Sequence, residues 1–432
     1  MSSSRSLRSK PSRRVVRFAL AGYALGVTAF HLAMLARLRR DANILPPVTL
    51  APPLSEQENP SVATATLPRV SVIVPARDEG RSIRACVESL LAQDYPNVEV
   101  IVVDDASTDA TPAILEDVLA SPLACTGRLR VVRVEALPEG WAGKPHALHT
   151  GASQATGKWL LFTDADTSHA PAALRSALRR AQHDHADLFS IITAQDTPDF
   201  WGRVIIPIAA MGISMLYPPS RVNDPKSEMA LANGQFLLIK REMYERVGGY
   251  ANPRLRATLV DDRDLAYEVK RAGGRLELVD GRELTRTRMY QSLREHWNGW
   301  GKNAYLGSPG GALLFPIMLA GLPLVSVLPF ALALLGIARQ RMGMALAGIV
   351  PVAAIVAYRS ALNRSLAIPW RYVWTHPLGA SVFTGILARS YWRGLHGRTV
   401  PWRGRSYALD KNDQSLSHRG SSLRTGSRAR DR

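Results

Sequence analysis

Acidic side chains follow three short apolar runs of this sequence, and their types suit the binding of a hard cation and of hydroxyl groups. The three clusters contain Glu79, then Asp104 and Asp105, then Asp164 and Asp166 with one alanine between them. Mg²⁺ and Mn²⁺ prefer oxygen ligands, usually one or two carboxylates together with substrate phosphates. Helix N-capping by Asp explains any one cluster, but it does not explain three of them at strand ends.

One further feature could act on a phosphorylated substrate. Lys144 follows Gly143 at the start of a predicted helix, where an ammonium group and backbone N–H groups can contact a diphosphate. An exposed loop lysine is the alternative interpretation. Asp261 and Asp262 precede the apolar positions of another helix, and from the residues alone they are explained by capping of that helix.

The elements that must position these residues alternate between strand and helix. We expect strands at 69–75, 98–104, 129–134 and 158–163, and helices at about 80–93, 109–120, 144–155 and 171–183. This alternation predicts an α/β domain with a mostly parallel, buried sheet. Such sheets bind ligands beyond the carboxyl ends of their strands, which is where the acidic clusters fall.

Apolar segments flank this predicted domain on both sides. Residues 18–36 carry no formal charge and span roughly 28 Å as a helix, about one hydrocarbon core. Basic residues follow this run where a signal peptide would have a cleavage site, so we expect a retained transmembrane helix. Residues 312–338 and 342–358 predict a transmembrane hairpin. Residues 372–388 are marginal, and we favour an interfacial position for them, as for the apolar segment 200–217.

The whole chain therefore divides into five predicted parts. They are a basic N-terminus with the first transmembrane helix (1–40), a Pro-rich linker (41–68), the α/β domain (69–303), apolar segments (304–390) and a basic, partly disordered tail (391–432). The formal charge of +18 suits an anionic membrane surface. We expect no nucleic-acid partner, because the basic clusters lack interleaved aromatic residues and any known DNA-binding pattern. Two cysteines exclude a disulfide scaffold and a four-Cys metal site.

Six motifs, taken together and in order, resemble those of the family-2 glycosyltransferases, which have the nucleotide-diphosphosugar transferase (GT-A) fold. They are RVSVIVPARDEG, VVDDASTDAT, GWAGKPHALHTG, LFTDAD, NGQFLLIKREMYERVGGY and VDDRDLAYEVKRAGG. The resemblance covers residues 69 to about 303. With an apolar hairpin behind this domain, the chain is most similar to the lipid-directed subgroup, which includes ceramide glucosyltransferases and bacterial hopanoid- and carotenoid-associated glycosyltransferases.

The resemblance implies a role for residues of each motif. The nucleotide-sugar would be contacted by Ala76, Glu79, Asp104, Asp105, Lys144 and Asp164, and a divalent cation, Mg²⁺ or Mn²⁺, by Asp166 with Asp164. The catalytic base would be Asp262, in a pair with Asp261 where many members have Glu. The acceptor would be faced by Asn233, Gly234, Gln235, Arg294, Trp297 and Lys302. The spacing of Gln291, Arg294 and Trp297 departs from the tight Gln-x-x-Arg-Trp signature of processive synthases.

The expected function is that of a membrane-bound, metal-dependent hexosyltransferase. It would move one sugar, with inversion and without processivity, from a nucleotide-diphosphosugar, by resemblance a UDP-sugar, to a hopanoid, carotenoid or ceramide-like lipid. We expect a multi-pass protein of the cell (inner) membrane with a cytoplasmic catalytic domain, although the basic N-terminus would then lie outside, against the positive-inside tendency. A processive polysaccharide synthase and a non-catalytic membrane scaffold are the alternatives.

Overall fold

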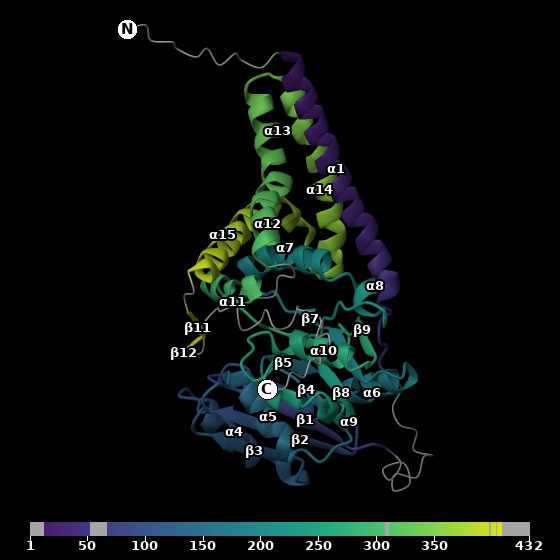
Figure 1. The fold of residues 1–432 in the computed structure, drawn as a ribbon, viewed down its shortest axis with the longest axis vertical. Coiled ribbons are helices and arrows are strands. Elements are labelled where there is room, and N and C mark those ends of the chain that lie inside the picture. Colours follow the sequence, from purple (N-terminus) through teal and green to yellow (C-terminus); the bar gives the residue numbers. More distant parts are fainter. Residues whose placement is uncertain (1–12, 52–66, 307–310, 397–398, 403, 408–432) are drawn as a thin grey trace, which may run out of the picture.

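A computed structural model describes residues 13–51, 67–306, 311–396, 399–402 and 404–407. In this structure an α/β domain lies at one end of a group of apolar helices (Figure 1). The N-terminal residues 1–12, the linker residues 52–66 and the tail residues 408–432 fall outside the description, so our expectations for those stretches concern residues that the structure does not describe.

A seven-stranded sheet forms the centre of the α/β domain, in the order β3-β2-β1-β4-β8-β6-β9. Strand β8 is antiparallel to both of its neighbours, and the other pairs are parallel, so the expected mostly parallel sheet is confirmed. The strands are β1 (Val70–Ala76), β2 (Val98–Asp105), β3 (Leu129–Val134), β4 (Trp159–Phe162), β6 (Leu188–Ile192), β8 (Leu237–Lys240) and β9 (Leu276–Asp280).

Helices cover both faces of this sheet, because successive side chains of a strand point to opposite faces. On β1, Val72 and Val74 belong to one buried cluster, with residues of α3, α4 and α6, whereas Ile73 belongs to the other, with residues of α5, α9 and α10. The helices are α3 (Ile83–Leu91), α4 (Thr111–Leu119), α5 (Gly143–Gln154), α6 (Ala173–His183), α9 (Arg241–Arg246) and α10 (Asp261–Arg271). These layers fix the sheet edge that carries the acidic residues.

Smaller elements lie near the carboxyl ends of the central strands and between the helices. A three-stranded sheet consists of β5 (Thr167–His169), β10 (Thr285–Thr287) and β7 (Ala194–Gln195), with β10 in the middle. It holds Asp166 in place, because the Arg288 N–H donates to the Asp166 carbonyl oxygen at 3.2 Å. The remaining short helices are α8 (Pro219–Val222) and 3-10 turns at Pro122–Thr126, Gly249–Ala251 and Trp370–Thr375.

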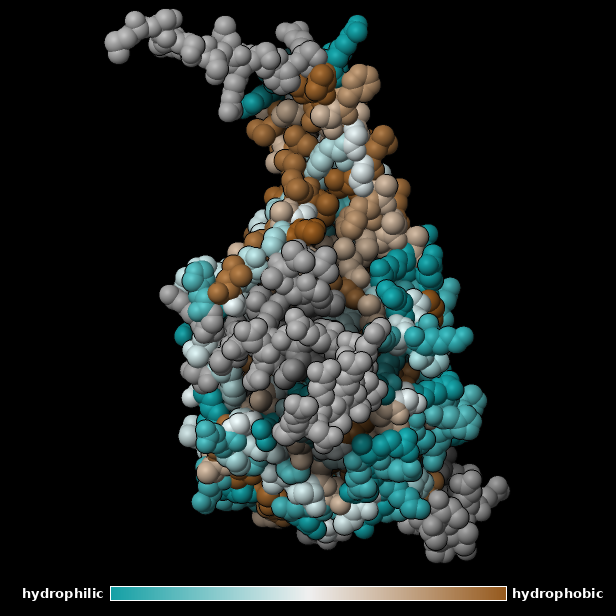
Figure 2. Space-filling model, viewed as in Figure 1, coloured by the Kyte–Doolittle hydropathy of each residue, from teal (hydrophilic) through white to brown (hydrophobic). Residues whose placement is uncertain are grey.

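The apolar helices form a bundle beyond the α/β domain (Figure 1). It contains α1 (Arg13–Ile44), α12 (Gly311–Ser326), α13 (Leu328–Ala338) and α14 (Met342–Ser365). Three stretches of the described chain are long and apolar enough to cross a membrane, namely Arg14–Ile44, Phe315–Ala338 and Met342–Ser365. Figure 2 shows hydrophobic residues over these helices and mostly hydrophilic residues over the α/β domain. The chain is therefore built for association with a membrane.

Three helices lie between the bundle and the α/β domain: α7 (Phe200–Leu216), α11 (Leu293–Leu306) and α15 (His376–Leu395). They contact one another, and α7 lies across the lower ends of the bundle helices in Figure 1. After α15 the chain returns to the α/β domain as a hairpin of β11 (Val400–Trp402) and β12 (Arg405–Tyr407). The sequence had not indicated structure in this part of the tail.

Candidate active site

A lysine and two carboxylates meet at the carboxyl edge of the sheet. The Lys144 Nζ atom lies 2.8 Å from Asp164 Oδ1 and 3.3 Å from Asp261 Oδ2. Lys144 is in the first turn of α5, Asp164 follows β4, and Asp261 begins α10. These side chains meet because Asp164 follows β4 at the carboxyl edge of the sheet, and α5 and α10 pack against the same face of that sheet.

This cluster shifts the proton affinities of its members. Burial alone would lower the pKa of Lys144, but the charges of Asp164, Asp261 and Asp262 raise it well above its ordinary value. The pKa of Asp261 is raised above its ordinary value, first of all by burial. The charge of Lys144 acts to lower this pKa, and the charge of the neighbouring Asp262 acts to raise it. Lys144 therefore stays charged at neutral pH, and it faces the place where an anionic ligand would enter from the cavity.

Asp262 has a different environment from its neighbour Asp261. Both residues line the same cavity, but Asp261 is buried, with 5% of its surface exposed, whereas Asp262 is only partly buried. Asp262 Oδ2 accepts the Gly234 N–H at 2.9 Å, and Oδ1 accepts the Arg263 N–H at 2.7 Å. A Cβ atom at Gly234 would lie 3.0 Å from Lys144 Nζ, so glycine gives the loop its close approach to the cluster. Backbone donors thus hold the Asp262 carboxylate at the cavity wall.

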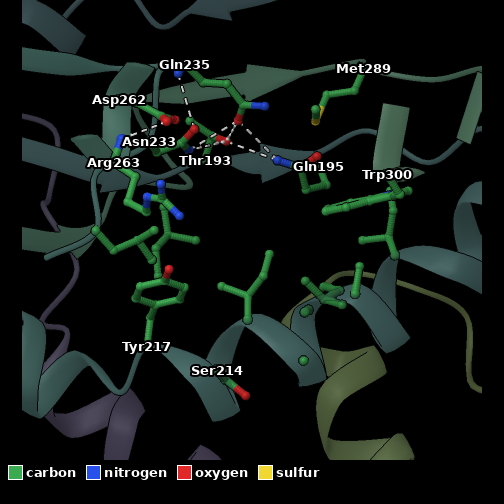
Figure 3. A pocket seen from close by; sticks show the side chains of 18 of the residues that line it. Thr193, Gln195, Ser214, Tyr217, Asn233, Gln235, Asp262, Arg263, Met289 and Trp300 are labelled. Carbon is green, nitrogen blue, oxygen red and sulfur yellow. Dashed lines mark hydrogen bonds between the residues drawn. The ribbon is translucent and has the colours of Figure 1, made fainter. Parts of the chain in front are cut away.

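The cavity of about 1820 Å³ connects this polar edge with the apolar helices. Its polar end includes Asp164, Asp166 and Asp262, and its apolar wall comes from α1, α7, α12 and α14. The apolar side chains include Phe30, Met34, Met211, Met215, Ile317, Met318 and Leu322. Figure 3 shows the open space between Asp262 and Gln235 on one side and α7, with Ser214 and Tyr217, on the other. One space therefore offers both charged and apolar surfaces.

A hydrogen-bonded group of polar side chains lines the cavity near Asp262 (Figure 3). Gln235 Oε1 accepts from Thr193 Oγ1, from Gln195 Nε2 at 3.3 Å and from Asn233 Nδ2 at 3.2 Å. Thr193 and Gln195 lie beyond the end of β6, and Asn233 and Gln235 lie in the loop before β8. This network fixes amide and hydroxyl groups next to Asp262, where they can orient a polar head group.

The two aspartates of the 164–166 motif both line the cavity. Asp166 Oδ1 accepts a hydrogen bond from Thr287 Oγ1 at 3.4 Å, and Asp164 is paired with Lys144. Within the part of the chain that the structure describes, no group of three or more His, Cys, Asp or Glu side chains could hold a metal by itself. Two carboxylates on one wall fit a Mg²⁺- or Mn²⁺-type site that substrate phosphates complete.

The structure places most of the expected site residues around this cavity. Ala76, Glu79, Asp105, Asn233, Gln235 and Lys302 line it together with the residues described above. Gly234 takes part through its backbone. Asp104 does not line the cavity: its Oδ1 accepts the Ser107 N–H at 3.0 Å, so it caps its own turn.

Two expected acceptor residues, Arg294 and Trp297, do not line the cavity. Arg294 is exposed, and the Trp297 ring packs beside Gly385 of α15. On the same helix, Trp300 and Lys302 line the cavity instead. Burial and the charge of Lys144 lower the pKa of Lys302 to about 8, and Asp261, Asp164 and Asp262 act in the opposite direction. The residues of α11 that line the cavity, Trp300 and Lys302, therefore lie closer to the C-terminal end of the helix than Arg294 and Trp297.

Sequence reasoning missed several residues of this edge. Thr193 and Gln195 follow β6, a strand that was not among the expected ones. Asp164 was found by inspecting the residues after an expected strand, and the same inspection after β6 would find Thr193 and Gln195. Arg405 and Tyr407 come from the C-terminal hairpin: the Arg405 guanidinium pairs with both carboxylate oxygens of Asp105, and Tyr407 lines the cavity. Their own neighbourhood in the sequence carries no signal that would place them here.

Comparisons with known proteins agree with the fold and the motifs. Residues 71–248 match the family described as Glycosyl transferase family 2. A Beta-monoglucosyldiacylglycerol synthase of Synechocystis sp. is 31% identical over 226 residues, which cover 51% of this chain and 43% of that protein. A 4,4'-diaponeurosporenoate glycosyltransferase of Staphylococcus aureus is 26% identical over 357 residues, which cover 79% and 89%.

The extent of these matches differs between relatives. The chain spans 30%, 43% and 37% of the length of the first three curated relatives. Among solved structures, the mannosyltransferase PcManGT of Pyrobaculum calidifontis, in complex with GDP-Man and Mn²⁺, is 22% identical with a TM-score of 0.49. That comparison covers 87% of this chain and 99% of the mannosyltransferase chain.

Proposed function

Because the chain carries a glycosyltransferase family 2 domain, we propose that it moves a single hexose from a nucleotide-diphosphosugar to a hydroxyl or carboxyl group of a membrane lipid. The observation that carries this proposal is the cavity, which joins the Lys144–Asp164–Asp261 cluster to the apolar wall of α1, α7, α12 and α14. The polar end suits a sugar diphosphate, and the apolar wall suits a lipid chain.

The donor would lie along the carboxyl edge of the sheet. Asp105 and Ala76, which line the cavity, would contact the nucleoside, and Lys144 at the start of α5 would contact the diphosphate. A divalent cation held by Asp164 and Asp166 would neutralise the departing diphosphate. A UDP-sugar is the default donor, because the resemblance to the family favours it.

Asp262 would act as the base. Its carboxylate, anchored by two backbone N–H groups, would take the proton of the acceptor group as the acceptor oxygen bonds to the anomeric carbon. The bond from that carbon to the diphosphate oxygen breaks on the opposite side, so the configuration inverts. Asp261 faces Lys144 and would position this lysine. One base suffices, so the two-carboxylate plan of the glycosidases is not required.

The acceptor would enter from the membrane side. The names of two relatives indicate the synthesis of a monoglucosyldiacylglycerol and the glycosylation of 4,4'-diaponeurosporenoate. In this chain the apolar helix α7 forms part of the cavity wall next to α1 and α12. A lipid held by its apolar part presents one head group to Asp262, which favours a single transfer. We infer a multi-pass protein with its catalytic domain on the cytoplasmic side, where nucleotide-sugars are found.

A transfer assay tests this proposal. Membranes that contain the chain, the Asp262→Asn variant or the surface control Asp224→Asn receive radiolabelled UDP-glucose with Mg²⁺ or Mn²⁺, followed by extraction with organic solvent. We expect a labelled lipid with the unchanged chain and the control, and at least about a hundredfold less with Asp262→Asn, because a positioned base typically contributes that much. Label in an insoluble polymer would identify a polysaccharide synthase. Absence of label with several donor sugars and lipid extracts would favour a non-catalytic scaffold.

A further inference from the structure

The C-terminal hairpin follows α15 and reaches the edge of the sheet that carries Asp105. Its strands β11 and β12 pair antiparallel, and Gly404 turns the chain between them with a φ of +73°. The hairpin lies well beyond residues 71–248, where the family match ends. It contacts residues that are about 300 positions earlier in the sequence.

Arg405 of this hairpin forms a two-pronged ion pair with Asp105. Its Nη1 and Nη2 atoms contact Oδ2 and Oδ1 respectively, the second at 3.0 Å. The side chains are 18% and 5% exposed, so the pair is shielded from solvent. Planar Arg–carboxylate pairs of this kind have a fixed geometry and are stronger than neutral hydrogen bonds. The ion pair therefore holds the Asp105 carboxylate in one orientation.

The same guanidinium lies against the first residue of α5. A Cβ atom at Gly143 would be 2.2 Å from Arg405 Nη1, 2.8 Å from Asp105 Oδ2 and 3.1 Å from the Tyr407 hydroxyl oxygen. The Gly143 N–H also donates to that hydroxyl oxygen, at 3.4 Å. Three polar side-chain groups thus converge on a helix N-terminus next to Lys144, and only a residue without a side chain leaves room for them.

We propose that this hairpin completes the donor site, with Arg405 orienting Asp105 toward the nucleoside and presenting its remaining N–H groups to the diphosphate at the start of α5. The inference rests on the proposed function, since it needs a nucleotide-sugar at this edge. Arg has five N–H donors, of which Asp105 takes two and the Tyr407 hydroxyl group one, and a carboxylate has about four acceptor positions. The ion pair therefore leaves both partners able to bind a ligand. The long Gly143–Tyr407 hydrogen bond can yield to a phosphate oxygen.

The positive charge of the hairpin favours a role in binding the donor over a role in blocking the donor site. A segment that blocked the donor site would gain from a neutral or acidic side chain there, because a diphosphate is an anion. The hairpin places a guanidinium, a permanent cation, beside Lys144 and the N-terminal dipole of α5. This arrangement attracts the donor, so we assign the hairpin to donor binding.

Nucleotide binding by the full-length chain in detergent micelles tests the assignment. Isothermal titration with UDP, and with GDP, CDP and dTDP as alternatives, gives Kd, and donor-dependent kinetics give KM and kcat. We expect Arg405→Ala to raise Kd and donor KM about ten- to a hundredfold, with kcat within about threefold, since a charge-assisted hydrogen-bonded contact is lost. Arg405→Lys keeps the charge without the two-pronged geometry and should restore binding only in part.

Two further variants guard against a trivial loss of folding. Gly143→Ala places a methyl group where the guanidinium lies, so we expect it to displace the Arg405–Asp105 pair and to weaken donor binding, and a cooperative thermal unfolding transition checks that the variant is folded. Arg393→Ala in α15 removes the same charge elsewhere and should leave Kd unchanged.

The outcomes distinguish a failure of the role assigned to the hairpin from a failure of the proposed transferase function. Unchanged Kd in both Arg405→Ala and Gly143→Ala would overturn the assignment while leaving the proposed function intact. Tighter nucleotide binding in these variants would overturn it in favour of an occluding latch. Failure of the unchanged chain to bind any nucleoside diphosphate would remove the proposed function, and the inference with it.

Discussion

Adjacent aspartates of this site differ because their surroundings differ. Asp261 is enclosed with Lys144, and its pKa is raised first of all by burial. Asp262 receives two backbone N–H groups and opens onto the cavity. A carboxylate that must accept a proton from a substrate has to reach it, so access favours Asp262 as the base and leaves Asp261 to hold the lysine.

Lys302 predicts a pH dependence of donor use. Its pKa of about 8 reflects burial and the charge of Lys144, and the carboxylates of Asp164, Asp261 and Asp262 keep it from falling further. A lysine is charged below its pKa, so Lys302 loses its charge as the pH rises through about 8. We expect donor KM to increase above this pH, because the site then attracts the diphosphate less strongly.

Steady-state kinetics of the unchanged chain and two variants between pH 6.5 and 9.5 check this expectation. Lys302→Arg keeps a charge throughout this range and should flatten the rise in donor KM, whereas the exposed control Lys226→Arg should not. An identical rise in Lys302→Arg and in the unchanged chain would assign the pH dependence to another group.

At the scale of elements, only some of the residues at the carboxyl ends of the strands could be predicted from the sequence. Asp105 and Asp164 were predicted to lie together because continuous apolar runs indicate buried parallel strands, whose carboxyl ends share an edge. Thr193 and Gln195 lie on the same edge but were missed, because Ser190 interrupts the apolar run of β6. The topology of the sheet, with β8 antiparallel between β4 and β6, had no counterpart in the local pattern.

Other differences arise from features that local sequence does not encode. The expected span 312–338 is found as one apolar stretch, Phe315–Ala338, with a one-residue break at Val327 between α12 and α13. Pro329 explains the break, because it has no N–H to donate to the preceding turn, yet it does not alter the hydropathy of the stretch. The face of α11 that meets the cavity depends on packing against α15, which is why Arg294 and Trp297 were expected in the wrong place. The three-residue strands of β11 and β12 are too short to show a period.

Helix α7 offers a direct test of the acceptor cavity. Gly212 lines the cavity, and a Cβ atom there would meet no other atom within 4 Å. Gly212→Phe should therefore fill part of the cavity without disturbing the helix, and we expect kcat/KM for the lipid acceptor to fall by about tenfold or more. The Kd for the donor nucleotide should stay the same, because Asp105 and Lys144 lie at the other end.

Gly212→Ala is the matched control for this prediction. It adds one methyl group and improves helix propensity by about 1 kcal/mol, so transfer should remain close to that of the unchanged chain. Equal transfer by the Phe and Ala variants would show that the acceptor does not use this part of the cavity.

The Lys144–Asp164–Asp261 cluster lies at a boundary between two environments of the whole molecule. The cavity reaches from the sheet edge, which is surrounded by hydrophilic surface, to helices that are apolar enough to cross a membrane. Figures 1 and 2 show this change along the long axis of the molecule. A water-soluble donor and a lipid acceptor could therefore meet without either leaving its own phase. This arrangement requires the α/β domain to face the compartment that supplies the donor.

Orientation in the membrane is the prediction that belongs to this scale. The start of α1 and the turn between α13 and α14 lie at the end of the bundle away from the α/β domain (Figure 1). Basic residues flank both ends: Arg339 and Arg341 in that turn, and Arg37, Arg39 and Arg40 near the α/β domain. Arg13, Arg14 and Arg17 at the start of α1 add to the far end, so the positive-inside tendency does not favour a cytoplasmic α/β domain, whereas the need for a cytosolic nucleotide-sugar requires one.

A cysteine-labelling experiment decides between the two orientations. In a Cys125→Ser background, where Cys86 is buried, we expect a membrane-impermeant maleimide to label Gln340→Cys in intact cells. Ser153→Cys, on the exposed surface of α5, should react only after the cells are permeabilised. The reverse pattern would place the α/β domain outside the cell, where cytosolic nucleotide-sugars are absent, and would contradict the proposed donor. Labelling of both positions in intact cells would mean that Phe315–Ala338, the candidate span that separates them in the sequence, does not cross the membrane.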